Sequence, residues 1–177
     1  MNSSELYQSK RFLLSFSEKL SLGLSKTKQC FIRELLYGIS KAQTVIISDI
    51  ARALEESSPF QTTKRLCRNA SSFSHFRSLQ DNYLHSLKKQ LTDDKLLLVD
   101  SSDITKPYAQ HFEALGHVHD GSSGRIEKGY TIINFSIASP KSKHPIPIYS
   151  HRCSAAEDQF DSMNVETMKG VNQMPIW

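Results

Sequence analysis

The hydrophobic pattern of this 177-residue chain changes its period near residue 92. Before that point apolar residues recur every three or four positions, as they do on one face of a helix, and after it they alternate or form short runs, as they do in strands. The clearest run, from Leu96 to Val99, is apolar on both faces and passes directly into Asp100. We therefore predict an α+β or α/β chain with an all-helical domain over 1–92 and a sheet-containing domain over 93–177.

Charge follows the same division. Residues 1–90 hold 14 Lys and Arg against 7 Asp and Glu, a balance of +7, and residues 91–177 hold 8 against 11, a balance of −3, which together give the net charge of +4. A basic first part suits a polyanion such as DNA, and an acidic second part suits metal ions. Two ordinary solvated surfaces would explain the same division.

Several helices are predicted in the first part. The stretch 31–39 and the longer stretch 76–91 both place apolar residues on one helical stripe. Residues 48–56 predict a further helix that begins at Ser48, a residue type that favours the N-cap position. Pro59 is expected to end that pattern.

A basic helix is predicted next, over about 62–70, with Thr62 or Thr63 as its cap. Two short helices in this order resemble a helix-turn-helix, whose second helix enters the major groove of DNA. Lys64, Arg65 and Arg68 are predicted to share one face of this helix, because they lie three and four positions apart. The alternative is a basic face that only contacts solvent.

Three strands are predicted in the second part. The run from Leu96 to Val99 reads as a central buried strand. The stretch 130–139 alternates, with Ile133, Phe135 and Ile137 on one side. The stretch 144–153 contains two prolines, which places it at a sheet edge because proline cannot donate to a ladder.

The remaining segments of the second part are predicted as follows. Residues 104–129 read as a long polar loop, and 139–144 reads as a hairpin loop. Residues 155–171 predict a helix with three large side chains inward. These inward residues are Phe160, Met163 and Met168.

Asp100 is the strongest candidate for chemistry. A carboxylate at the end of a buried strand is costly to desolvate unless it faces a cleft and meets a metal ion or a donor. Mg²⁺ binds carboxylates together with waters and phosphate oxygens, and a pair of such ions activates phosphodiester cleavage. Alternatively, Asp100 caps a turn with Ser101, Ser102 or Asp103.

The sequence LLLVDSSDITKPY resembles the first catalytic motif of DDE transposases of bacterial insertion sequences. Flanking stretches are similar to the same group: TVIISDIARAL and TTKRLCRNAS to its DNA-binding region, and the two later strands to its ribonuclease H-like core, which has a mixed sheet. The resemblance implies that Asp100 is the first metal-binding Asp of the triad, that Asp103 supports it, and that Mg²⁺ is the cofactor. It implies that the partner is double-stranded DNA at the transposon ends. Assembly into a homo-oligomer is a further expectation. Lys106 is a further supporting candidate that either contacts a phosphate or is only solvated.

The chain departs from that family in its later carboxylates. The triad needs a second Asp on a fourth strand and a Glu on a later helix. The carboxylates after the third predicted strand all fall on one predicted helix: Glu157, Asp158, Asp161 and Glu166. We therefore expect a truncated, inactive N-terminal fragment of a transposase, with an incomplete ribonuclease H-like domain. The alternative is a non-catalytic DNA-binding protein that occupies transposon ends or inhibits the full-length enzyme.

Other candidate sites are weaker. His117, His119 and Asp120 would form a metal site only if they lay on a strand, and a polar loop is the commoner explanation. Cys153 lies near His151, but that proximity does not make a catalytic dyad. Gly121 and Gly124 are expected in a turn. The three cysteines show no CxxC pair, so neither a zinc site nor a disulfide framework is indicated.

The cellular location is predicted from the lack of a membrane span and of a signal peptide in the sequence. No apolar run approaches the ~20 residues that a membrane span needs, and the N-terminus does not have the basic-then-apolar order of a signal peptide. We expect a bacterial cytoplasmic protein, associated with the nucleoid and not with a membrane.

Overall fold

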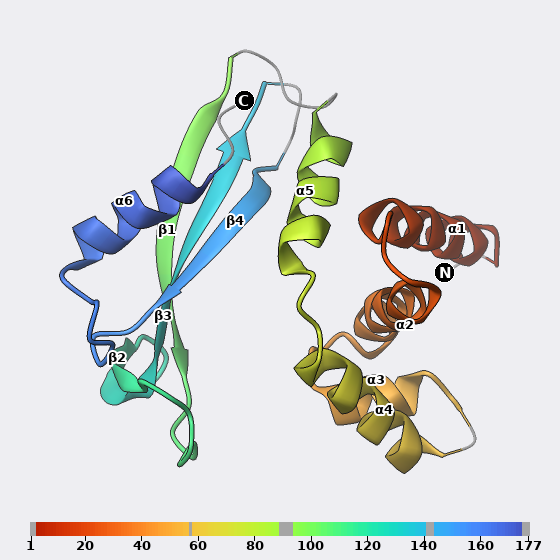
Figure 1. Cartoon of the computed structure of the whole chain (residues 1–177), viewed down its shortest axis with the longest axis horizontal. Helices are drawn as coiled ribbons and strands as arrows, with labels where there is room; N and C mark the ends of the chain where they lie inside the picture. The colour runs from red at the N-terminus through yellow and green to blue at the C-terminus, as the bar shows by residue number, and fades with distance from the viewer. Residues whose placement is uncertain (1–2, 57, 89–93, 141–143, 175–177) are drawn as a thin grey trace. The chain divides into compact units, whose positions relative to one another are not determined.

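The chain forms two compact units, residues 1–89 and 90–177, which are described separately below. The computed structural model describes residues 3–56, 58–88, 94–140 and 144–174 (Figure 1). Within these residues the fold is mixed α+β, with six helices and a four-stranded antiparallel sheet. The sequence placed the domain boundary three residues later, after residue 92.

The first unit is helical, as its hydrophobic period predicted. Its helices are α1 (Ser3–Leu20), α2 (Lys26–Ala42), α3 (Ile47–Ala53), α4 (Pro59–Ser71) and α5 (Phe76–Leu87). One apolar core joins α2, α3 and α4 with the segments that precede α2 and α5. Its buried members are Leu24, Phe31, Ile32, Ile50, Ala51, Leu66 and Phe73.

The caps of α3 and α4 differ from the predicted ones. Helix α3 has Ile46 at its N-cap position, so the prediction of a cap at Ser48 is wrong. Pro59 begins α4 instead of ending α3, because proline fits the first helical position, where its missing N–H has no partner to lose. Ser58 is the N-cap, and its side chain accepts a hydrogen bond from the Gln61 backbone N–H at 3.4 Å. The predicted cap Thr62 is buried inside the helix.

The second unit is a sheet with one described helix. Its elements are β1 (Leu96–Thr105), β2 (Gly116–Asp120), β3 (Arg125–Ala138), β4 (Ile146–Cys153) and α6 (Met163–Gln173). Strand β3 pairs antiparallel with all three other strands. Strand β1 lies along one side of β3, and β2 and β4 lie along successive parts of the other side, as Figure 1 shows.

The central strand is therefore β3, and β1 is not central. Ile133, Phe135 and Ile137 are buried on one face of β3, which confirms the predicted alternation. Strand β4 pairs only with β3 among the described strands, which confirms its predicted edge position. A bulge between Phe135 and Ser136 interrupts this pairing beside Pro147, as expected where a proline cannot continue the ladder.

The prediction of a buried strand from Leu96 to Val99 is wrong in both its burial and its length. Within the described residues β1 pairs with β3 alone, and Leu96 to Val99 are 41–70% exposed. The strand also continues through Asp100 and Asp103 to Thr105. Polar residues are tolerated there because an exposed strand does not have to remove them from water.

The expected polar loop over 104–129 contains a strand that its polar composition did not predict. Strand β2 forms a hairpin with β3, closed by residues 121–124. The Asp120 carboxylate accepts hydrogen bonds from the Ser122 backbone and from both serine side chains of the turn, and these bonds lower the pKa of Asp120 to about 2. Gly124 has a φ of 68°, so the turn prediction for Gly121 and Gly124 is confirmed.

Helix α6 starts later than predicted and turns a different face inward. It begins at Met163, after the N-cap Ser162. Met163 and Met168 are 37% and 56% exposed, so their predicted burial is wrong. The buried positions are Glu166 and Gly170, one turn apart, because that stripe faces the sheet.

Two further predictions fall partly outside the described residues. These are the tip of the hairpin loop over 139–144 and the end of the helix predicted over 76–91, whose described part is α5. No described helix has the length and apolar character that a membrane span requires.

Candidate functional site

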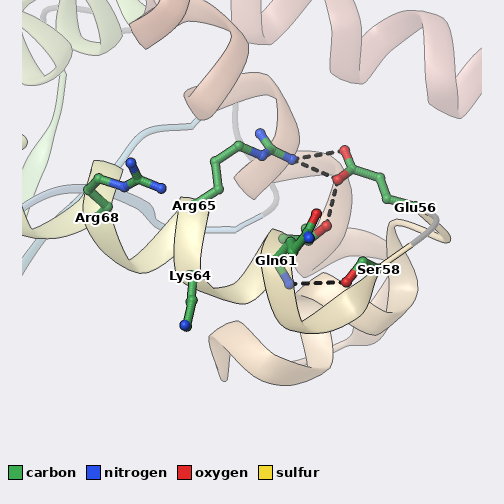
Figure 2. Close-up of a pocket in the computed structure, with 7 residues that line it drawn as sticks. Glu56, Ser58, Gln61, Lys64, Arg65 and Arg68 are labelled. Carbon is green, nitrogen blue, oxygen red and sulfur yellow. Dashed lines mark hydrogen bonds and ion pairs between the residues drawn. The ribbon is translucent and has the colours of Figure 1, made fainter.

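Helix α4 presents the basic residues that the sequence singled out. Leu66 points into the helical core, and α4 packs against α2 and α3. A shallow pocket lies at the start of the helix (Figure 2). Its lining residues are Glu56, Ser58, Gln61, Thr62, Lys64, Arg65 and Arg68.

The three basic side chains of this pocket have different surroundings. Lys64 is exposed, and its Nζ lies 4.4 Å from the centroid of the Phe60 ring, a favourable cation–π distance. Arg68 is also exposed and has no ion pair or side-chain hydrogen bond to any described residue. Arg65 turns away from Lys64, as Figure 2 shows, and is engaged within the protein.

Arg65 joins three segments of the helical unit. Its Nη1 donates to Glu34 Oε2 on α2 at 2.5 Å, and its Nη2 donates to both carboxylate oxygens of Glu56 at 2.8 and 2.9 Å. Glu56 also accepts a hydrogen bond of 2.5 Å from the Thr62 hydroxyl. The bond from Thr62, together with those from Arg65, lowers the pKa of Glu56. Partial burial opposes the charge on Arg65, but its two carboxylate partners raise the pKa of Arg65 overall.

Asp100 lies in the middle of β1, directly opposite Asn134 on β3. Its side chain is exposed, and no described residue forms a hydrogen bond or ion pair with it. Residues directly opposite each other in an antiparallel pair point to the same face of the sheet. Asp100 therefore shares a face with the Asn134 amide.

That face carries a row of polar side chains across three strands. Asn134 donates through Nδ2 to Ser102 Oγ on β1 at 3.1 Å, and its Oδ1 accepts from Ser150 Oγ on β4 at 2.9 Å. Arg152 stands on the same face, stacked on the Tyr130 ring at 4.7 Å. The sequence placed Asn134 on the polar side of its strand, but the strand register that sets it opposite Asp100 could not be read from spacing.

Asp103 points to the other face of β1, because side chains alternate along a strand. It accepts a hydrogen bond of 2.8 Å from the Thr131 hydroxyl on β3. Lys106 follows the end of β1, where its backbone N–H donates to the Lys128 carbonyl at 2.6 Å and its side chain is exposed. Asp100 and Asp103 therefore do not converge on one point.

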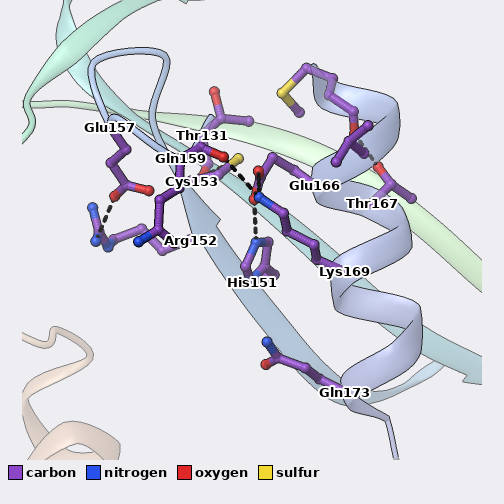
Figure 3. A network of polar contacts seen from close by, with 12 residues as sticks. Thr131, His151, Arg152, Cys153, Glu157, Gln159, Glu166, Thr167, Lys169 and Gln173 are labelled. Carbon is purple, nitrogen blue, oxygen red and sulfur yellow. Dashed lines mark hydrogen bonds and ion pairs between the residues drawn. The ribbon is translucent and has the colours of Figure 1, made fainter. Parts of the chain in front are cut away.

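The later carboxylates are divided among separate environments. Glu166 is 4% exposed on α6, where it accepts hydrogen bonds from His151 Nε2 on β4 at 2.8 Å and from Lys169 Nζ at 2.5 Å (Figure 3). The bond from His151, followed by that from Lys169, lowers the pKa of Glu166. Glu157 forms an ion pair of 2.8 Å with Arg152. Asp158 and Asp161 are exposed.

The weaker candidate residues do not form a metal site or a catalytic site. His117 and His119 lie on β2, on one exposed face, while Asp120 is committed to the hairpin turn. Cys153 is buried, and its thiol donates weakly to the Thr131 carbonyl at 3.7 Å. Burial raises the pKa of Cys153, so its reactive thiolate is disfavoured. Among the described residues no group of three or more His, Cys, Asp or Glu could hold a metal ion.

Comparisons of the chain with protein-family models, with curated proteins and with solved structures found no match.

Proposed function

We propose that this chain is a DNA-binding protein of the DDE transposase type, in which the helical unit binds transposon ends. The sheet unit carries Asp100, the first metal-binding carboxylate that the motif resemblance implies. The observation that carries the proposal is the environment of Asp100. It stands exposed at mid-strand, without a described partner, on a face lined with hydroxyl and amide groups.

The helical unit supports the DNA-binding part of this proposal. Its balance of +7 favours a polyanionic partner, since phosphate contacts dominate the affinity of proteins for DNA. Helices α3 and α4 pack against each other, with five residues between them. Lys64 and Arg68 of α4 are exposed, as the residues of a recognition helix that meet the major groove must be.

The order of strands supports one part of the ribonuclease H-like assignment. The resemblance implies a sheet in which the third strand lies outside and the first strand lies in the middle. The place of β4 beside β3 agrees with the first point, with β2 as an additional short strand beside β3, but β1 pairs with β3 alone among the described strands and is not in the middle.

A pair of Mg²⁺ ions does not fit the described residues by themselves. Two-metal cleavage needs several ligands that hold the ions about 4 Å apart, and Asp100 is the one carboxylate on its face of the described sheet. We therefore expect no strand cleavage or joining by the purified chain in Mg²⁺ or Mn²⁺. Cleavage that Asp100→Ala abolishes would instead assign a complete nuclease to this chain.

Gel-shift titration against duplex DNA tests the binding function. The triple variant Lys64→Ala, Arg65→Ala, Arg68→Ala should bind more weakly, with a shallower dependence on salt, because each lost phosphate contact changes the slope of log K against log salt by ~0.9. Lys10→Gln, on α1 and exposed, is the matched control for loss of a positive charge elsewhere. Equal affinity and slope for the triple variant and the wild type would remove α4 from the interface.

A non-catalytic DNA-binding protein is the alternative, and Mn²⁺ titration followed by NMR distinguishes the two functions. If Asp100 contributes to a metal site, paramagnetic broadening should centre on residues 98–102 and on Asn134, and Asp100→Asn should remove it. Broadening elsewhere, or none, together with retained DNA binding, would favour the non-catalytic protein.

A further inference from the structure

We infer that Arg65 is a positioning residue that holds α4 at a fixed angle to α2, and that Gln61, Lys64 and Arg68 form the DNA-contacting stripe. This inference rests on the proposed DNA-binding function of α4. It divides the basic residues of one helix between two roles that their sequence spacing did not separate.

The hydrogen bonds of Arg65 carry the first part of the inference. The guanidinium spans Glu34 on α2 and Glu56 in the segment between α3 and α4. Glu34 is 18% exposed and Arg65 is 36% exposed, so the contact is half-buried. With both carboxylates bound, both terminal nitrogens of the guanidinium are engaged by protein. Fewer of its donors are therefore open to a phosphate than in a free Arg side chain.

The negative charge of the partners adds to this argument. Glu34 and Glu56 together carry a charge of −2 beside Arg65, and the bond from Thr62 favours ionised Glu56. A phosphate that approached Arg65 would meet both carboxylates. Contact with DNA is therefore less favourable at Arg65 than at Lys64 or Arg68.

The contact stripe follows from helical geometry. Gln61, Lys64 and Arg68 lie at i, i+3 and i+7, so they lie along one side of α4. All three are exposed and line the same pocket (Figure 2). Gln61 is in the first turn, and the first residues of a recognition helix contact base edges. A Gln amide pairs with adenine, whereas Arg and Lys pair with guanine, so Gln61 adds an adenine-reading group to the two basic side chains of this stripe.

Two substitutions at position 65 distinguish a positioning residue from a residue that contacts DNA. Lysine keeps the charge but has no planar fork to bridge two carboxylates, whereas glutamine loses the charge. If Arg65 is a positioning residue, Arg65→Lys and Arg65→Gln should lose DNA affinity to a similar extent. The expected loss is about 5- to 30-fold, which corresponds to one or two kcal/mol of free energy. Both should keep the wild-type salt slope. Lys64→Gln and Arg68→Gln, the matched variants of the contact stripe, should each lower that slope by ~0.9.

Thermal unfolding of the full chain provides the second measurement, which does not depend on DNA. Both position-65 variants should lower the Tm of the helical unit by roughly 4–8 °C, whereas Lys64→Gln and Arg68→Gln should leave it unchanged. A near-normal affinity for Arg65→Lys with a slope lowered by ~0.9 for Arg65→Gln would overturn the inference and make Arg65 a phosphate contact. If the wild type does not bind DNA, the proposed function fails, while the Tm values still decide whether Arg65 positions α4 against α2.

Discussion

At the scale of single residues, Glu166 is a buried carboxylate that joins α6 to β4 in the sheet unit. It is 4% exposed and lies between the His151 imidazole and the Lys169 ammonium. Lys169 also donates to the Gln159 carbonyl at 3.0 Å. A buried carboxylate without these donors would be strongly unfavourable, so the network fixes α6 on β4.

The pKa of Glu166 predicts how stability depends on acid. Because the fold lowers this pKa from the usual 4.5, the ionised carboxylate contributes stability that is fully present above pH 4.5. That contribution is lost as pH falls through the lowered pKa. Glu166→Gln should reduce the free energy of unfolding by about 1–3 kcal/mol at neutral pH, and the difference from wild type should shrink below pH 4.5.

Urea unfolding from pH 7 to pH 3, followed by NMR signals of β4 and α6, measures this dependence. Asp158→Asn is the matched control, because Asp158 is exposed and a surface change of this kind costs less than about 0.5 kcal/mol. A Glu166→Gln variant that is as stable as the wild type at pH 7 would contradict the role of the network.

The candidate site could be predicted from sequence only where it depends on local spacing. The helix period brought Lys64 and Arg68 to one face, and both are exposed there. The partner of Arg65 on α2 is 31 positions away, so its ion pair with Glu34 depends on the packing of two helices and leaves no local signal. Asn134 was missed as a neighbour of Asp100 for the same reason, since strand register decides that pairing.

At the scale of elements, the close approach of α6 to the sheet depends on a glycine. A Cβ at Gly170 would lie 2.4 and 2.6 Å from two ring atoms of Phe135, which is itself fully buried. Neither the Phe135 ring nor α6 can move away easily, because Phe135 is packed at the centre of β3 and α6 is held by the hydrogen bonds of Glu166. The glycine therefore sets the distance between α6 and β3.

Gly170→Ala should therefore destabilise the sheet unit, although alanine is the better helix former. Overpacking costs about 1–3 kcal/mol, and the gain in helix propensity returns about 1 kcal/mol. We expect a net loss of up to about 2 kcal/mol, measured by urea unfolding of the full chain. The control is Gly121→Ala, where nothing lies within 4 Å of the added Cβ. Equal stability of the two variants would show that α6 moves away from Phe135 at no cost.

Helices and strands were predicted correctly where the hydrophobic period of the sequence agrees with the burial of the side chains in the structure. They were predicted poorly where the two differ. The alternation on β3 gave the correct inward face because that strand is covered on one side. The run from Leu96 to Val99 suggested burial on both faces, yet β1 is exposed. Periodicity describes which side chains are apolar, and the number of neighbouring strands and helices decides how much of that surface is covered. The short strand β2 was missed because polar residues and a turn surround it.

At the scale of the whole molecule, the two units differ in how completely they bury their apolar residues. Ile50 and Leu66 of the helical unit are fully buried within a core that draws on three helices. The sheet unit buries β3 well, but Leu96 to Val99 on β1 remain 41–70% exposed. Exposed apolar side chains on an edge strand favour association with other chains. We therefore expect the second unit to limit the solubility of the protein.

Hydrogen exchange of the full chain tests this difference between the units. Amides of α2 and α4 should exchange slowly and together, because opening them requires the helical core to unfold. Amides of β3 should be the most protected in the sheet, since this strand has partners on both sides. Along β1, protected and unprotected amides should alternate, because every second N–H of this strand points away from β3, its only partner among the described strands. Measurement over a range of protein concentrations is the control, since association through β1 would slow exchange as concentration rises. Continuous protection from Leu97 to Val99 in dilute protein, equal to that of α5, would show that another part of the chain covers this edge.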